Sequence, residues 1–166
     1  MKENFSSEVL DLVDLQLLDQ LQRNASLSNL ALAQQLSLTP PTCLRRVRRL
    51  KDLGLIEREI AVVNPARLSE FLGHGLHALA EVTLDRQDSE SLDQFEALAV
   101  ADDAVQQCWR VSPGPDFVLV LFAPDMPEYL ATTQRLFSQH ANVRNVKAFF
   151  STKRAKFTTL MPVLPT

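Results

Sequence analysis

The chain has 166 residues, of which 46% are hydrophobic, and a formal net charge of −3. This length suits one or two small domains with real cores. No apolar run approaches the roughly 20 residues that span a bilayer, and residues 1–14 lack the apolar stretch of a secretory signal, so we expect a cytoplasmic protein that does not enter a membrane. Cys43 and Cys108 lie too far apart in the sequence to fit a disulfide framework or a zinc site.

The balanced charge of the first 60 residues conceals a basic cluster. Residues 1–60 hold eight basic and eight acidic side chains. Five of the basic ones crowd the stretch from Thr39 to Gly54, and no acid appears in that stretch before Asp52. Mutual repulsion makes such a stretch poor at folding alone, but a local basic face can steer a polyanion.

Two helices are predicted before this cluster. A stripe of leucines predicts the first over residues 14–24, with Asp14 as its N-cap. The second is predicted over residues 28–36, where Ser28 is in position to cap it. Only residues 37–38 separate it from the basic stretch, so the connection has to be a tight turn.

The basic stretch predicts a third helix. Thr39 is its expected N-cap, and Pro40 and Pro41 fit the first turn because that turn needs no N–H donors from them. Gly54 is its expected C-terminal cap. At about 100° per residue, the helix has a buried stripe and an arginine face opposite to it. The stripe consists of Cys43, Val47 and Leu50; Arg45, Arg48 and Arg49 lie roughly opposite, and Arg46 lies on the flank.

Residues 55–65 predict a short hairpin or a single strand, because two isoleucines flank a run of charges there. Residues 64–65 then break it. These signals divide the chain into a helix-turn-helix domain at residues 1–64, a linker at residues 65–75 and a second domain at residues 76–166.

The second domain has the predicted element order strand, helix, strand, strand, helix, strand, which is typical of a ferredoxin-like fold. We expect Leu92, Phe95 and Leu98 in its first helix to face the core. The expected inner stripe of its second helix consists of Met126, Tyr129, Leu130, Thr133, Leu136 and Phe137. The fold class is therefore α+β, with an N-terminal winged helix-turn-helix domain and a C-terminal ferredoxin-like βαββαβ domain. The expected strands are residues 76–84, 104–111, 116–122 and 145–157, and the expected helices are residues 89–100 and 125–139.

The third of these strands is apolar on both faces ("FVLVLF"). A βαββαβ unit covers only one face of its sheet with helices, so a doubly apolar strand needs a second cover. We expect that cover to be another copy of the chain. The alternative is that the C-terminal tail, residues 158–166, folds over the sheet.

Three helices with a tight turn before a basic third one form a helix-turn-helix arrangement. The third helix fits the major groove, about 12 Å wide, where its arginines can meet phosphates and base edges. The alternative is a solvated helix whose arginines pair with Asp52 and Glu57. The residues expected to contact double-stranded DNA are Thr39, Pro41, Thr42, Arg45, Arg46, Arg48 and Arg49.

The segment from residue 10 to residue 65 ("LDLVDLQLL…AVVNP") resembles the N-terminal half of the Lrp/AsnC family, the bacterial and archaeal "feast/famine" regulators. Thr39 stands where the family's helix-turn-helix signature usually has Ser. The second half is similar to the family's effector-binding and assembly domain, and the resemblance runs from Leu12 to Pro162. It implies a transcription regulator that binds pseudo-palindromic DNA, assembles as a dimer, tetramer or octamer, and binds an amino acid between subunits.

Two departures from the family pattern stand out. Ser37 replaces the glycine of the turn before the third helix, at a small backbone cost. In the loop "VSPGPDF", residues 111–117, Pro113, Gly114 and Pro115 replace the family's Gly-Asp-aromatic core. Since two prolines remove two N–H donors, we expect weak or altered amino-acid binding, and an absent pocket is the alternative. The resemblance implies effector contacts at Ser112, Gly114, Asp116 and Phe117, with Asp116 accepting from the ligand's ammonium.

The remaining motifs indicate no enzyme, cofactor or metal. The three histidines, His74, His77 and His140, lack metal-ligand spacing, and we find no phosphate loop, nucleophile elbow or dinucleotide fingerprint. The rival to a DNA-binding regulator is a ferredoxin-like ligand-binding or enzymatic protein whose helical domain only mediates protein contacts. That rival needs catalytic groups near residues 112–117, where we identify only Asp116.

Overall fold

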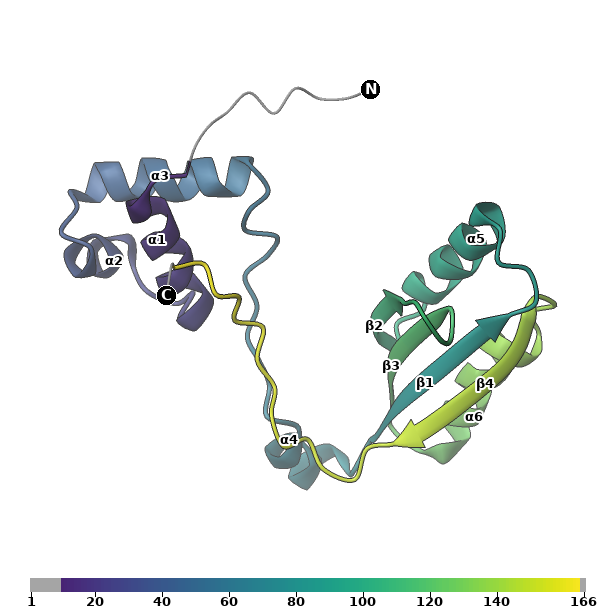
Figure 1. The fold of residues 1–166 in the computed structure, drawn as a ribbon. Coiled ribbons are helices and arrows are strands. Elements are labelled where there is room, and N and C mark those ends of the chain that lie inside the picture. Colours follow the sequence, from purple (N-terminus) through teal and green to yellow (C-terminus); the bar gives the residue numbers. More distant parts are fainter. Residues whose placement is uncertain (1–9, 165–166) are drawn as a thin grey trace. The chain divides into compact units, whose positions relative to one another are not determined.

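The computed structural model describes residues 10–164, which form two compact units (Figure 1). One unit ends at Val62 and takes up the chain again at Lys156, and the other is Val63–Ala155. The chain therefore passes between the units twice. The C-terminal tail from Lys156 onward groups with the first unit and not with the unit that contains the sheet.

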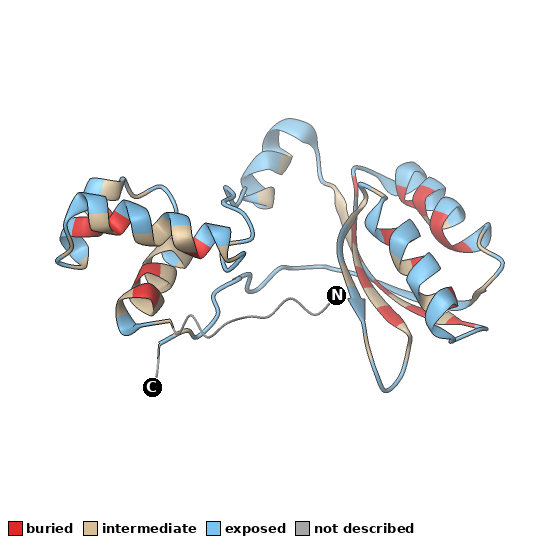
Figure 2. Cartoon of the chain, turned by 90° about the horizontal axis from the view of Figure 1, so that it is seen from above, coloured by how far each residue is buried: buried red, intermediate tan, exposed pale blue. Residues whose placement is uncertain are grey.

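The first unit is built from three helices, α1 (Leu12–Arg23), α2 (Asn29–Gln35) and α3 (Pro40–Asp52). Their apolar stripes meet in one small core, seen as red bands on the ribbon of Figure 2. The predicted inner stripe of α3 is confirmed, since two of its members are fully buried. The buried apolar members of this core are Leu17, Leu32, Ala33, Cys43 and Leu50.

Helix α1 begins earlier than predicted. Asp11 has the extended backbone of an N-cap, and its Oδ1 accepts the Asp14 N–H at 2.9 Å. Asp14 Oδ2 in turn accepts the Asp11 N–H at 3.3 Å, which completes a capping box. The prediction that Asp14 caps α1 was wrong because the helix already includes Leu12, and Asp14 lies inside its first turn with only 1% of its surface exposed.

The turn between α2 and α3 is tight, as predicted. Ser37 has φ 54°, a left-handed conformation that costs a residue with a Cβ atom roughly 1–2 kcal/mol. The Leu38 N–H donates to the Ala33 carbonyl at 2.8 Å, and Asn29 Nδ2 donates to the Pro40 carbonyl at 2.9 Å. These two bonds fix the start of α3 against α2.

The hairpin or strand predicted over residues 55–65 does not form, and residues 57–64 are exposed without regular structure. A strand needs a neighbour to pair its backbone N–H and C=O groups, and this segment has none in the part of the chain that the structure describes. The segment that follows, expected as a linker at residues 65–75, contains helix α4 (Pro65–Leu72). Asn64 Oδ1 caps α4 by accepting from two backbone N–H groups, and Gly73 ends it with φ 84°.

The second unit has the predicted βαββαβ order. Its four strands form one antiparallel sheet in the order β2-β3-β1-β4, and the helices cover one face of it (Figures 1 and 2). The ferredoxin-like expectation is thereby confirmed. The elements are β1 (Leu76–Leu84), α5 (Ser89–Val100), β2 (Val105–Arg110), β3 (Phe117–Ala123), α6 (Met126–Thr133), a π-helical turn (Gln134–Ser138) and β4 (Val143–Phe150).

The helix-covered face of the sheet carries the core of this unit, although three expected core residues point elsewhere. Leu98, Met126 and Leu130 are all more than a third exposed. In α5, Phe95 is buried as expected, and Ala99 takes the inner position expected for Leu98. In α6 and the π-helical turn, Tyr129, Leu136 and Phe137 are buried as expected, and Thr132 takes the inner position expected for Thr133.

The opposite face of the sheet is apolar and partly open. Strand β3 alternates, with Phe117, Leu119 and Leu121 buried towards the helices and Val118, Val120 and Phe122 on the other side. Pairing in register places Leu79 of β1 opposite both Val120 and Phe149, and Trp109 opposite Val118. This set forms the open sheet face: Leu79, Trp109, Val118, Val120, Phe122 and Phe149. Trp109 is 58% exposed and Phe149 45%.

Candidate functional site

The outer face of α3 presents two arginines to solvent. Arg45 and Arg48 are exposed and make no ion pair with any residue that the structure describes. They line a shallow groove together with Pro41, Leu44, Arg49 and Asp52. Two unpaired guanidinium groups one turn apart on a helix suit phosphate oxygens and guanine edges, which both accept hydrogen bonds from Arg.

The other two arginines of α3 turn towards α1. Arg46 Nη1 lies 2.7 Å from Asp14 Oδ1, and Arg49 Nη1 lies 2.9 Å from Asp14 Oδ2. Arg46 also reaches Asp11 Oδ2 at 2.8 Å. A buried charge without a partner is strongly destabilising. Here two guanidinium groups balance the one buried carboxylate. The side chains of Arg46 and Arg49 are only 22% and 28% exposed, so this cluster holds α3 against α1.

The hydrogen bonds and charges around Asp14 shift the pKa values of Asp11 and Arg46. The Asp14 N–H bond lowers the pKa of Asp11 despite some desolvation, and Arg46 lowers it further. Hydrogen bonds to Asp14 and then to Asp11 raise the pKa of Arg46. Both shifts favour the charged forms of Asp11 and Arg46.

The salt bridges seen in this unit differ from those of the solvated-helix alternative. That alternative paired the arginines with Asp52 and Glu57, whereas Arg46 forms salt bridges with Asp11 and Asp14, and Glu57 lies 3.6 Å from Arg58. Lys51, the fifth basic residue of the stretch from Thr39 to Gly54, pairs with Glu59 at 2.9 Å.

The N-terminal end of α3 holds the remaining expected DNA contacts. The hydroxyls of Thr39 and Thr42 lie 2.8 Å apart, and Pro41 is exposed. Thr39 caps α3 with its backbone alone, because its side chain makes no cap hydrogen bond. The structure thus separates the seven expected residues into an N-terminal group, an outer pair (Arg45 and Arg48) and an inner pair (Arg46 and Arg49).

The loop at residues 111–117 joins β2 to β3 and is tied to the end of β1 by Asp116. Asp116 Oδ2 accepts the Leu84 N–H at 2.7 Å and Gln87 Nε2 at 3.2 Å. The Asp116 N–H donates to the Val82 carbonyl at 2.9 Å, and its own carbonyl accepts the Val111 N–H at 3.0 Å. One carboxylate oxygen of the expected ammonium acceptor is therefore already engaged within the fold.

The other expected effector contacts do not converge with Asp116. Phe117 is fully buried among the residues of the helix-covered face, with its ring centroid 4.9 Å from that of Phe95 and the Arg110 guanidinium 5.7 Å above it. Ser112 is exposed, and Gly114 has φ 121° with open space around it. Phe117 is the first residue of β3, and the two-residue period of the strand turns it inward.

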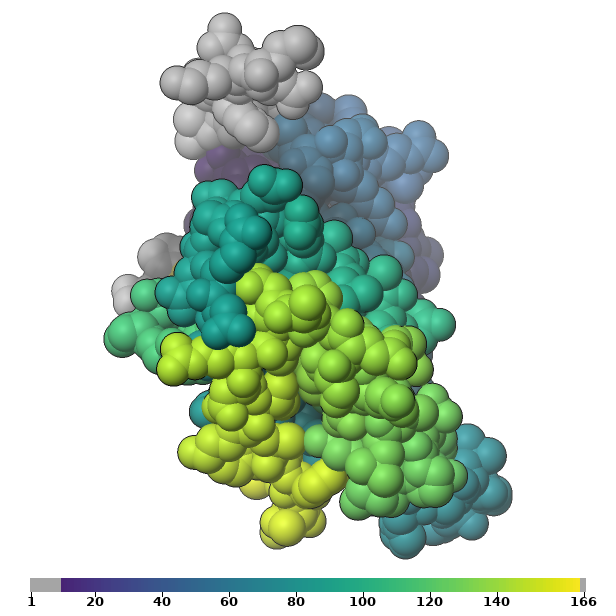
Figure 3. Space-filling view, turned by 90° about the vertical axis from the view of Figure 1, so that its right-hand side faces the viewer, coloured from purple at the N-terminus to yellow at the C-terminus, as the bar shows by residue number. Residues whose placement is uncertain are grey.

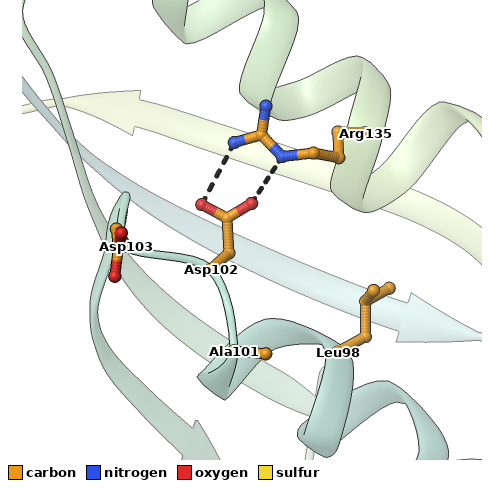
Figure 4. A pocket seen from close by; sticks show the side chains of 5 residues that line it. All are labelled: Leu98, Ala101, Asp102, Asp103 and Arg135. Atoms are coloured by element: carbon orange, nitrogen blue, oxygen red, sulfur yellow. Dashed lines mark hydrogen bonds and ion pairs between the residues drawn. The ribbon is translucent and has the colours of Figure 1, made fainter.

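A shallow pocket of about 410 Å³ lies elsewhere in the second unit, between the end of α5 and the π-helical turn (Figure 4). Arg135 Nε and Nη2 reach the two oxygens of Asp102 at 2.6 and 3.1 Å. This bond lowers the pKa of Asp102 and raises that of Arg135. The Ala104 N–H also donates to Asp102 Oδ1, so Asp102 and Arg135 already serve the fold.

Neither the thiols nor the acidic groups of residues 10–164 suggest metal or redox chemistry. Burial raises the pKa of both Cys43 and Cys108, which disfavours the reactive thiolate. No group of three or more His, Cys, Asp or Glu within the described range could hold a metal ion. No helix in that range is long and apolar enough to cross a membrane.

Comparison with known proteins decides between the regulator and its rival. Residues 10–57 match the family model described as winged helix-turn-helix DNA-binding, and residues 77–161 match that of the Lrp/AsnC ligand binding domain. The chain belongs to the Lrp/AsnC family of transcriptional regulators. It is thus a DNA-binding regulator with a small-molecule-binding domain, and the enzymatic rival is set aside.

Individual Lrp/AsnC relatives cover most of the chain. It is 30% identical over 154 residues to an HTH-type transcriptional regulator of Sinorhizobium fredii, covering 93% of this chain and 89% of that protein. It is 35% identical over 127 residues to the leucine-responsive regulatory protein of Haemophilus influenzae, covering 76% and 74%. The structure is similar to that of a Neisseria meningitidis transcriptional regulator complexed with L-Met, with a TM-score of 0.81, 28% identity and coverage of 93% and 97%.

Asp14 is the residue of this Lrp/AsnC site that the sequence interpretation missed. As the expected N-cap, Asp14 is placed at the helix end and not in the interior. A signal was nevertheless present, because Asp14 precedes Leu17 by three positions and Leu21 by seven, which places all three on one helix face. An acid on an apolar stripe, with arginines on a neighbouring helix, indicates a buried ion pair.

Proposed function

We propose that this Lrp/AsnC regulator reads DNA with the outer pair of α3, Arg45 and Arg48, while the inner pair, Arg46 and Arg49, chiefly orients the helix. The supporting observation is that Asp14 pairs with only two of the four arginines, Arg46 and Arg49. A guanidinium held at 2.7 Å by a buried carboxylate has fewer donors left for a phosphate or a base. Thr39, Pro41 and Thr42 extend the proposed DNA face at the N-terminal end of α3.

Replacing Arg45 or Arg48 with Ala tests this proposal. If the side chain reads a base edge, affinity for a DNA duplex selected by the wild-type protein should fall by about 1–3 kcal/mol and specificity should relax at one position. If it contacts a phosphate, the slope of log affinity against log salt should fall by about 1. Arg67→Ala, which removes an exposed arginine paired with Glu70 on α4, is the matched control. Unchanged binding in both test variants would place the reading face elsewhere.

We further propose that the regulator is a homo-oligomer in which a second copy covers the open sheet face. Contiguous exposed apolar side chains on a protein surface commonly mark an interaction site. The family resemblance favours dimers that assemble into tetramers or octamers and bind pseudo-palindromic DNA. Since the family consists of bacterial and archaeal regulators, whose DNA lies in the cytoplasm, we propose that the protein acts in that compartment.

Two adjacent residues of β3 separate assembly from folding. Val120 belongs to the open sheet face, whereas Leu119 is fully buried under the helices. Val120→Asp should give a folded protein of lower mass in sedimentation, and Leu119→Asp should unfold it. A wild-type protein that sediments as a stable monomer at micromolar concentration would contradict the oligomer.

For the effector, we propose an amino acid or a related small molecule that binds weakly, or with altered preference, near residues 111–117. The Neisseria relative was solved with L-Met, which supports an amino acid as the class. Here Pro113 and Pro115 provide no N–H donors, and Asp116 already holds the loop, so fewer groups remain for a ligand.

Calorimetric titration with the twenty amino acids tests the effector proposal. Asp116→Asn is the informative variant because an amide oxygen can still accept the Leu84 N–H while the charge that would attract an ammonium is gone. Binding should be lost in this variant while thermal stability changes little. Tight binding of an ordinary amino acid that survives Asp116→Asn would contradict the proposed role of this carboxylate.

A further inference from the structure

The charges of the chain are divided unequally along its length. Residues 1–128 contain 11 basic and 20 acidic side chains, whereas residues 129–166 contain six basic ones and no acid. Of these six, Arg135 is paired with Asp102, and the others lie on β4 or after it. Residues 129–166 of this negatively charged chain are thus strongly basic. The proposed DNA contacts of α3 give no reason for the basic residues after β4.

The densest part of this stretch is the basic segment, which we define as residues 151–158. It begins where β4 ends, and the Ser151 N–H donates to the His77 carbonyl at 2.8 Å. Lys153, Arg154 and Lys156 follow within four positions, and every residue of the segment is exposed. Figure 3 shows this end of the chain, in yellow, at the surface.

The far end of the basic segment belongs to the DNA-binding unit. Lys156 and the residues after it group with the three-helix unit. The Met161 N–H donates to Gln22 Oε1 at 2.6 Å, and Gln22 Nε2 donates back to the Met161 carbonyl at 3.1 Å. Since an extended residue spans at most about 3.6 Å, Lys156 stays within roughly 18 Å of this attachment point on α1.

We propose that the basic segment is a second DNA-contacting surface, which binds the phosphate backbone without reading sequence. A lysine ammonium is a point charge on a flexible stem and suits phosphate oxygens better than base edges. The segment has no helix or strand that could insert side chains into a groove at a fixed register. Duplex DNA carries about one charge per 1.7 Å of axis, so an extended basic segment attached to a bound helix-turn-helix unit has phosphates within its reach.

The salt dependence of DNA binding tests this surface. We would compare Lys153→Gln/Lys156→Gln with Arg67→Gln/Arg86→Gln, which removes the same charge from exposed arginines that sit beside Glu70 and Asp88. If both lysines contact phosphates, the slope of log affinity against log salt should fall by about 1.8, at about 0.9 per contact. The control should keep the wild-type slope, and a test variant with that slope would overturn the proposal.

The same titrations separate this proposal from the α3 reading face on which it rests. The lysine variant should lose affinity by the same factor for a selected duplex and for an unrelated duplex of equal length, which leaves the specificity ratio unchanged. Arg48→Ala should lower that ratio. A lysine variant that lowers the ratio while keeping the slope would show that the segment does not contact the backbone.

A second readout uses the unmodified protein and so does not depend on any variant folding. Amine acetylation of the wild-type chain, followed by mass spectrometry, reports the reactivity of each lysine with and without saturating duplex DNA. Lys153 and Lys156 should be protected by DNA, and the protection should disappear at high salt. Equal reactivity of both lysines in the two states would overturn the proposal.

Discussion

The two sides of α3 carry similar arginines for opposite purposes. On the side facing α1, Arg46 and Arg49 surround the buried carboxylate of Asp14 at 2.7 and 2.9 Å. On the outer side, Arg45 and Arg48 meet no charged partner among the residues described. The difference lies in a single acid on α1. It teaches that a basic helix can divide its charges between holding its own position and reaching a polyanion, and that composition alone does not separate these roles.

The largest effect should come from removing the acid that creates the division. Asp14→Ala leaves two partly buried guanidinium groups without their carboxylate and also breaks the capping box of α1. Losing one partner of a buried ion pair costs about 3–5 kcal/mol, and because both arginines keep some contact with water we expect about 3 kcal/mol less stability. Urea unfolding measures this loss. DNA affinity should fall as well, because α3 loses its anchor on α1.

An intermediate effect should separate the inner arginines from the outer ones. Arg46→Ala removes the charge-assisted hydrogen bond to the buried Asp14, worth about 1.5–3 kcal/mol, so the free energy of unfolding should fall by about 2 kcal/mol. The bond to the half-exposed Asp11 adds little. Arg48→Ala should leave stability within about 0.5 kcal/mol of the wild type, as surface changes generally do, and act on DNA affinity alone. Equal stability losses in the two variants would erase the distinction between the two sides of α3.

A smaller effect concerns the turn that places α3 against α2. Ser37 holds φ 54°, which glycine adopts without a Cβ penalty. Ser37→Gly should therefore raise stability by up to about 1 kcal/mol, offset in part by the greater freedom of the unfolded chain. Thermal unfolding measures the gain, and DNA affinity should not change. A loss of stability would mean that the serine makes a favourable contact in the native turn.

The smallest effect should appear in acid. The pKa of Asp11 is lowered by the Asp14 N–H and by Arg46, and that of Asp102 is lowered chiefly by Arg135. Their stabilising contribution is present above the unfolded-state pKa of Asp, about 3.9, and is lost as the pH falls towards the lower folded-state pKa. Stability measured between pH 6 and pH 2.5 should fall less steeply in Asp102→Asn than in wild type. Identical profiles would show that Arg135 does not favour the charged form of Asp102.

The prediction from sequence succeeded where local patterns carry the information. The apolar stripe of α3 with Cys43 and Leu50, the prolines in its first turn and the βαββαβ order all depend on spacings within one element. It failed where a side chain has a choice of neighbours. Leu98 was expected inside because it lies three positions after Phe95, yet Ala99 takes that place. The segment 55–65 has strand-like composition but finds no partner strand among residues 10–164.

By itself, therefore, the sequence determined the three helices of the first unit, the βαββαβ order of the second, the basic character of α3 and the family, because periodicity, turn residues and charge are written along the chain. Only the tertiary structure decided which arginines remain available, since Asp14 lies 32 and 35 positions from its partners. It also decided that Phe117 points into the core, that Asp116 is tied to β1, and that the C-terminal tail joins the helical unit through Gln22. In each case a long-range contact selects one of several orientations that the local backbone allows.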